Sequence, residues 1–161
     1  MKKLLFVLML AVSHVSIAQL SKDDVDIIQS LYGKSKKDLV SKYMTLPTEQ
    51  QAAFWTMYDA YEAERKVLGQ ERFKLINQYA KEYVTLDDAT TDVLAKAVIK
   101  NNIAYEKLLD KYYGKCKKIT GALNAAKFVQ LEAYLQTTVK SELQDDIPFI
   151  GEIDRTIPHQ H

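Results

Sequence analysis

One stretch of the chain decides its fold. Residues 48–84 read TEQQAAFWTMYDAYEAERKVLGQERFKLINQYAKEYV. Apolar side chains recur along it in steps of three and four, with two arginines counted as polar members of the same seam: Phe54, Tyr58, Tyr61, Arg65, Leu68, Arg72, Leu75 and Tyr79. A mean step of about 3.5 residues is typical of helices that pack along their length, and not of strands. The stretch therefore predicts one long helix.

A second seam with the same spacing follows: Leu94, Val98, Asn101, Tyr105, Leu108, Tyr112, Cys116 and Ile119. Proline, which interrupts helices, is absent from residues 48–147. The pattern breaks only at residues 84–88, between the two seams. We therefore expect long helices over 48–84 and 88–119, joined as an antiparallel hairpin.

Polar residues mark where these helices begin and end. Thr48 and Gln51 have the spacing of a capping box, in which the two side chains satisfy the first backbone N–H groups of a helix. Thr120 and Gly121 mark a further break, after which residues 123–143 continue as a helix. We interpret Thr48, Gln51 and Thr120 as helix caps. Residues 21–43 predict a shorter helix or a broken pair.

These elements predict an all-α fold, an elongated long-helix hairpin with shorter flanking helices. Five glycines and three prolines are few for an all-β protein, which needs many turns. Two arrangements remain open: a three- or four-helix bundle folded back on itself, or an elongated protomer that covers its flank in a homodimer. We favour the homodimer, because a hairpin this long leaves much of its flank uncovered.

The first residues have the pattern of an export signal. Lys2 and Lys3 precede an apolar run over residues 4–12, and Ser16 and Ala18 are small residues at the positions that signal peptidase reads. The run is too short to cross a bilayer. We therefore expect a cleaved signal peptide at 1–18, a helical domain at 19–144 and an irregular tail at 145–161, with the mature protein in the periplasm.

Composition excludes several kinds of function. The 22 basic and 21 acidic residues give a net charge of +1, which disfavours a nucleic-acid-binding protein. One cysteine and three histidines are few for a metal site. The chain has no nucleotide-binding or catalytic motif. We expect a non-enzymatic protein with no catalytic residue, no metal and no cofactor.

Lysines gather along one flank of the second long helix: Lys96, Lys100, Lys107, Lys111, Lys115 and Lys118. One interpretation is a partner-binding face, centred on Lys100, Lys107, Lys111 and Lys115, for an acidic polypeptide or a lipid headgroup. The other is an ordinary solvated flank. Contact with a membrane surface stays undecided at this point.

Three positions in the two seams are polar where an apolar residue would pack better. Residues whose numbers sum to about 170 face each other in the predicted hairpin, so we expect Arg65 to pair with Glu106 and Arg72 with Asn101. Alternatively, both arginines extend to solvent at the seam edge. Cys116 is expected to be a small buried hydrophobe, and the alternative is an intermolecular disulfide.

Two passages resemble the repeated LTxxQ-type signature of the Spy/CpxP family of periplasmic helical proteins. The first runs from Leu46-Pro47-Thr48 to Phe54, and the second from Ile119-Thr120-Gly121 to Glu132. Each has a short apolar-Thr turn that opens an alanine-rich helix with a phenylalanine. Pro47 intervenes in the first passage, and Leu123 stands where the second would have glutamine.

This resemblance implies an elongated helical protomer, often a curved antiparallel dimer, that holds unfolded or flexible envelope proteins in a chaperone-like role. Metal-sensing relatives carry histidine-rich segments that this chain lacks, so metal binding is not implied. The alternative function is a regulatory binding module for an envelope-stress sensor or an anti-sigma system.

Overall fold

The computed structural model describes residues 35–145, with side chains described as far as Ser141. Nearly all of this range is helical, and it contains no strand. A short helical segment, residues 35–43, precedes three long helices: α3 (Thr48–Glu82), α4 (Asp88–Thr120) and α5 (Ala122–Asp145). The predicted all-α class is confirmed. The predicted signal peptide lies outside the described residues, as does the predicted tail apart from Asp145, which ends α5.

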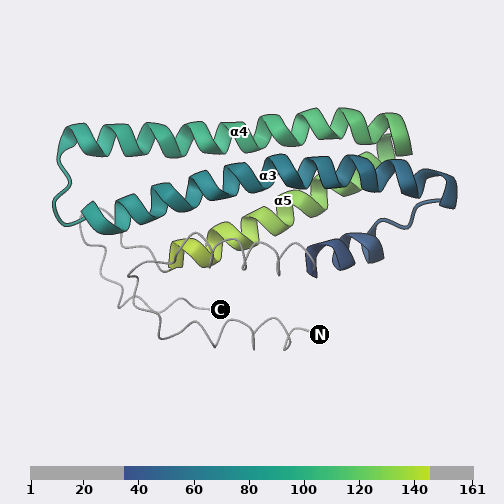
Figure 1. Cartoon of the computed structure of the whole chain (residues 1–161), viewed down its shortest axis with the longest axis horizontal. Helices are drawn as coiled ribbons and strands as arrows, with labels where there is room; N and C mark the ends of the chain where they lie inside the picture. Colours follow the sequence, from purple (N-terminus) through teal and green to yellow (C-terminus); the bar gives the residue numbers. More distant parts are fainter. Residues whose placement is uncertain (1–34, 146–161) are drawn as a thin grey trace.

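Helices α3 and α4 lie side by side as an antiparallel hairpin, and α5 folds back beneath them (Figure 1). The helix bounds agree with the expected 48–84 and 88–119 to within two residues. The segment 35–43 lies at the end of the bundle where α4 meets α5. Within the described residues the chain thus covers part of its own flank, and the homodimer stays a prediction. None of these helices is both long and apolar enough to span a membrane.

The start of α3 differs from the predicted capping box. Pro47 takes the N-cap position with φ −53° and ψ 147°, and no side chain caps the helix. Thr48 is already its first helical residue, because the proline ring holds the preceding position in an extended conformation. The Gln51 side-chain amide instead donates to the Leu46 carbonyl oxygen at 3.1 Å. Gln51 therefore ties the helix to the preceding linker.

Asp87 caps the start of α4. Its carboxylate accepts a hydrogen bond from the Thr90 backbone N–H at 2.7 Å, as expected for an aspartate in this position. This bond favours the charged form, so the pKa of Asp87 is lowered, chiefly by the Thr90 backbone N–H. The predicted break at residues 84–88 is confirmed, and the Asp87 cap explains why α4 begins there.

The Asp87 cap predicts a pH-dependent effect on stability. Folding lowers the pKa of Asp87, so the charged carboxylate stabilises the folded state. This stabilisation is complete above the pKa of aspartate in the unfolded chain, about 3.9, and is lost as the pH falls through the lower pKa of the folded state. Asp87→Ala should therefore lower the melting temperature at about pH 7 and have a smaller effect near pH 2. Thermal melts followed by circular dichroism test this. An effect that stays constant across this range would contradict it.

The break between α4 and α5 is confirmed, but Thr120 acts at the end of α4 and not as a cap of α5. Its hydroxyl donates to the Cys116 carbonyl oxygen at 3.0 Å, one turn earlier in the same helix. Gly121 has φ +82°, where a side chain would be strained, and its N–H donates to the Lys117 carbonyl at 3.0 Å. The glycine reverses the chain because it alone adopts this conformation readily.

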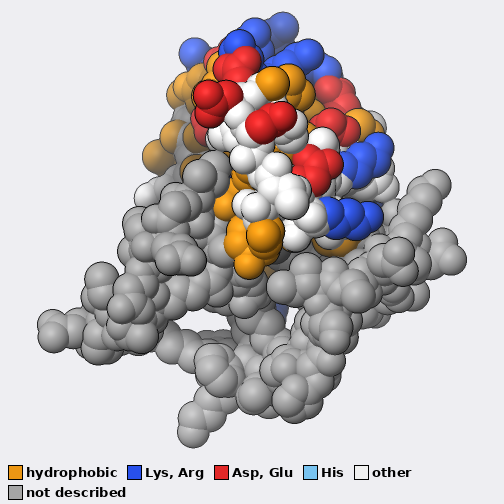
Figure 2. Space-filling model, turned by 90° about the vertical axis from the view of Figure 1, so that its left-hand side faces the viewer, with side chains coloured by type: hydrophobic (Ala, Val, Ile, Leu, Met, Phe, Trp, Pro, Cys, Tyr) orange, Lys and Arg blue, Asp and Glu red, His pale blue; other side chains and the backbone are white. Residues whose placement is uncertain are grey.

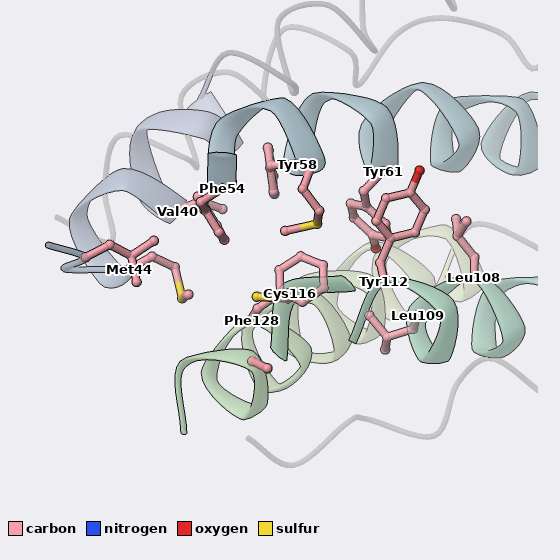
Figure 3. Close-up of a cluster of buried hydrophobic side chains, with 13 residues drawn as sticks. Val40, Met44, Phe54, Tyr58, Tyr61, Leu108, Leu109, Tyr112, Cys116 and Phe128 are labelled. Carbon is pink, nitrogen blue, oxygen red and sulfur yellow. The ribbon is translucent and has the colours of Figure 1, made fainter. Parts of the chain in front are cut away.

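The main core lies at the end of the bundle where α4 joins α5 (Figure 3). Its centre is aromatic: the Tyr61 ring makes edge-on contacts with Tyr112, at 5.3 Å between centroids, and with Phe128, at 5.2 Å. Such pairs contribute beyond the burial of their surface. Its members come from the segment 35–43, the 44–47 linker and all three long helices: Val40, Met44, Leu46, Phe54, Met57, Tyr58, Tyr61, Leu108, Leu109, Tyr112, Cys116, Ala125 and Phe128.

Candidate functional site

A lysine is completely buried at the centre of the bundle. Lys36, from the segment 35–43, has a side chain only 1% exposed. Its ammonium lies 2.5 Å from Glu62 Oε1 on α3 and 2.6 Å from Glu132 Oε2 on α5. Charged groups removed from water are stable only when they are paired and hydrogen-bonded. The two carboxylates satisfy this requirement and join three separate parts of the chain.

Further groups complete the shell around these carboxylates. The Tyr61 hydroxyl donates to Glu132 Oε2 at 2.8 Å, and the Tyr58 hydroxyl lies 3.4 Å from Oε1 of the same residue. The Arg65 guanidinium donates twice to Glu62, at 2.8 and 3.0 Å. We refer to Lys36, Tyr58, Tyr61, Glu62, Arg65 and Glu132 together as the buried charge cluster.

Two aromatic rings also face the ammonium. Lys36 Nζ lies 5.3 Å from the ring centroid of Tyr61 and 5.7 Å from that of Tyr58. A cation at this distance from a ring face is attracted by the ring quadrupole. The ammonium thus has two carboxylates and two rings around it, which is the chemistry of a cage for a primary ammonium group.

The surroundings of Glu62 favour its charged form. Burial acts to raise the pKa of Glu62, but the hydrogen bonds from Arg65 and the charge of Lys36 outweigh it, so the pKa lies below its usual range. Burial, followed by the charge of Glu132, raises the pKa of Tyr61 well above its ordinary value, so this hydroxyl remains a donor. Two cations balance two carboxylates, and the cluster is neutral as a whole.

This cluster was not predicted from the sequence. One signal was available: Glu132 follows Phe128 by four residues, so a carboxylate shares the apolar face of α5. A second was Glu62, which directly follows the seam residue Tyr61. Neither signal names Lys36 as the partner, because that residue is 26 positions from one carboxylate and 96 from the other.

The predicted partner of Arg65 differs from the observed one. Arg65 pairs with Glu62 on its own helix, whereas the predicted partner Glu106 is exposed on α4. The physical reason is local: Glu62 lies one turn before Arg65, on the same face of α3, and needs a cation to remain charged when buried.

Arg72 contacts α4, as expected, but one residue away from the predicted position. Its guanidinium donates to the Asn102 side-chain oxygen and lies over the Tyr105 ring, 5.7 Å from its centroid. Asn101 is buried, and its amide donates to the Leu68 carbonyl oxygen at 3.0 Å. Both asparagines therefore tie α4 to α3, but Asn101 reaches the backbone of α3 and not the arginine.

The lysines of the predicted partner-binding face are all exposed: Lys100, Lys107, Lys111 and Lys115. Two of them are held in place. Lys111 pairs with Glu64 of α3 at 2.7 Å, and Lys115 lies 4.3 Å from the ring centroid of Tyr112. Tyr112 also donates to Glu64 at 2.8 Å, and burial, followed by this bond, raises its pKa to about 12.

Apolar side chains share the outward face of α4 with the other lysines. Ile99 and Ile103 follow each other by one helical turn and are 57% and 50% exposed. Lys96, Lys100 and Lys107 lie within about one helical turn of them, and all three are exposed; Lys96 also pairs with Asp92 at 2.6 Å. We call the two isoleucines and the three lysines the α4 ridge. In Figure 2, which views the end with the α3–α4 turn, basic side chains gather at the top and hydrophobic ones are exposed near them.

Cys116 is buried, as predicted from its place in the seam, with an exposed fraction of 0%. Burial raises the pKa of its thiol, and its sulfur lies 3.5 Å from the Thr120 hydroxyl oxygen. The Thr120 contact acts to lower this pKa, but burial outweighs it, so the thiolate fraction that reacts with electrophiles is reduced.

The thiol of Cys116 should therefore be protected in the folded protein. We expect a disulfide reagent such as DTNB to react with it at least about tenfold more slowly in buffer than in concentrated urea, because reaction requires local opening. The absorbance of the released thiolate measures both rates. Equal rates would show that Cys116 is accessible and would favour the intermolecular disulfide.

Among the described residues no group of three or more histidine, cysteine or acidic side chains is placed to hold a metal ion. Comparisons with protein-family models, with curated proteins and with solved structures found no match for this chain.

Proposed function

We propose that this chain is an exported, non-enzymatic helical protein that binds unfolded or flexible envelope proteins in a chaperone-like way. The observation that carries the proposal is the α4 ridge, where Ile99 and Ile103 are half exposed among three lysines. Exposed apolar residues beside cations suit flexible chains that present apolar segments with acidic flanks. The resemblance of residues 46–54 and 119–132 to the Spy/CpxP signature supports the same function and a periplasmic location.

Suppression of aggregation tests this proposal. We expect the protein, at a few-fold molar excess and without ATP, to reduce light scattering by an aggregating client. The double variant Ile99→Ser/Ile103→Ser should lose most of this effect, whereas Leu123→Ser, which changes a 75% exposed leucine on α5, should keep it.

Two results would reject the proposal: no suppression by the wild-type protein, or equal suppression by both variants. In a pull-down from envelope extract, one stoichiometric membrane protein in place of many transient clients would favour the regulatory binding module.

A further inference from the structure

The segment 35–43 is bound to the long helices in the way that a peptide ligand is bound to a groove. Lys36 enters the buried charge cluster, and Val40 and Met44, four and eight residues later, are 1% and 5% exposed in the core. Lys36 and Val40 are one turn apart on one face of the helical segment. Met44, whose N–H donates to the Val40 carbonyl oxygen at 2.8 Å, continues this face into the linker. The opposite face is solvated, since Asp38 and Lys42 are exposed. The segment is therefore an amphipathic helix with a lysine at the start of its buried face.

The groove is made by α3 and α5. Glu62 and Glu132 form its acidic end, and Phe54, Tyr58 and Phe128, all 1% exposed, form its apolar part. Without Lys36 this groove would hold two carboxylates and one cation, Arg65. Its charge of −1 matches a single ammonium, and the rings of Tyr58 and Tyr61 suit a compact cation.

The connection to α3 is short and bordered by open space. Residues 44–47 are not helical, and Pro47 is extended. A hollow of about 500 Å³ lies beside this linker, lined in part by Thr45, Pro47 and Trp55.

The segment's other polar contacts are at the surface: Lys37 pairs with Asp59 at 2.8 Å, and their side chains are 47% and 61% exposed. Lys37 also lies 5.0 Å from the Trp55 ring centroid, and the exposed Tyr43 hydroxyl lies 3.4 Å from Gln130 Oε1. Among the described residues, the buried contacts of the segment are those of Lys36 and its apolar side chains.

From these observations we propose that residues 35–43 form an intramolecular strap, and that the groove beneath it binds a lysine-bearing amphipathic helix of a partner protein. The partner helix would place its ammonium between Glu62 and Glu132 and its apolar residues on Phe54 and Phe128. The strap occupies this site until such a helix competes for it. The groove is distinct from the α4 ridge, and the proposal does not depend on the chaperone-like function.

A peptide that copies the strap is the probe for this site. It has the sequence of residues 35–47, SKKDLVSKYMTLP, with a fluorophore at its C-terminus. The receiving protein is the full chain with Lys36→Ala, in which the strap has lost its anchor. We expect a saturable rise in anisotropy on binding. A peptide carrying Lys36→Met should bind about thirtyfold more weakly or worse, because both carboxylates lose their shared partner.

The neighbouring lysine is the matched control. A peptide carrying Lys37→Met loses one ion pair and one ring contact, both at the surface, and should bind less than about fivefold more weakly. Equal losses at the two positions, or no binding by the unaltered peptide, would overturn the proposal. So would a wild-type dimer that is lost in the Lys36→Ala variant, since it would assign the groove to a second copy of the chain.

A measurement on the wild-type chain covers the case in which Lys36→Ala fails to fold. The strap has an effective local concentration that only millimolar peptide can match. When millimolar peptide is added to the wild-type chain, amide hydrogen exchange over residues 38–43 should become faster than without peptide. The central residues of α3 should keep their protection. Unchanged exchange in the strap at saturating peptide would reject displacement.

Discussion

Replacing Phe128 with alanine is expected to lower the free energy of unfolding by about 3–5 kcal/mol. Phe128 is 1% exposed and contacts the rings of Tyr58 and Tyr61 at 6.4 and 5.2 Å between centroids. The substitution removes the apolar surface of the ring and leaves a cavity that aromatic neighbours on a helix cannot fill without moving the backbone. Urea unfolding followed by circular dichroism gives the measurement.

Leu123→Ala provides the control within the same helix. Leu123 is 75% exposed, so its loss should change the free energy of unfolding by no more than about 0.5 kcal/mol. Both changes introduce alanine into α5, and the helix propensities of leucine and phenylalanine differ by less than about 0.7 kcal/mol, which is too little to account for the expected difference. A cost below about 1 kcal/mol for Phe128→Ala would contradict the packing of α5 against the hairpin.

The second large effect is expected from Glu132→Ala, which should lower the free energy of unfolding by about 3 kcal/mol. Glu132 accepts hydrogen bonds from Lys36 and Tyr61 and is buried, so its removal leaves one uncompensated cation in the core. Breaking a buried ion pair typically costs about 3–5 kcal/mol. The lower end applies, because Glu62 still pairs with Lys36.

Asp59→Ala is the matched control for this prediction. Asp59 also pairs with a lysine of the segment 35–43, but that pair is exposed, and its loss should cost about 1 kcal/mol or less. Raising the salt concentration should weaken the Lys37–Asp59 pair and affect the buried one far less. If both variants cost the same, the Lys36–Glu132 contact would have no special role in stability.

The buried charge cluster is a costly way to join helices. Apolar residues of similar volume in place of a buried ion pair often preserve or increase stability. A cluster that uses one lysine, two glutamates and an arginine at the bundle centre therefore calls for a reason other than stability. A replaceable strap is such a reason, because an ion pair specifies which helix occupies the groove.

Much of the fold could be predicted from the sequence. Alternating steps of three and four residues, from Phe54 to Tyr79 and from Leu94 to Ile119, determine helices whatever their partners are. The breaks between the helices were also predictable, because Asp87 and Gly121 act on backbone groups within a few residues of their own position. The local errors were in the caps: Pro47 takes the N-cap in place of Thr48, Gln51 contacts the linker, and Thr120 acts at the end of α4.

The candidate site was predictable only in part. Exposure of Lys100 and Lys107 follows from their places on a helix whose opposite face carries the seam. The partner of Arg72 was not predictable, because a shift of one residue in the register between two helices changes which side chains meet. The partner of Arg65 was missed for a different reason: the buried Glu62 one turn earlier on the same helix takes its guanidinium.

What the sequence by itself determined is the set of helices, their ends and the face of each that is apolar, because these depend on residues within one or two turns. The tertiary structure alone decided that Lys36 meets Glu62 and Glu132. That contact requires α5 to return alongside α3 and the segment 35–43 to lie between them. Spacing along one helix carries no information about which distant side chain supplies the opposite charge.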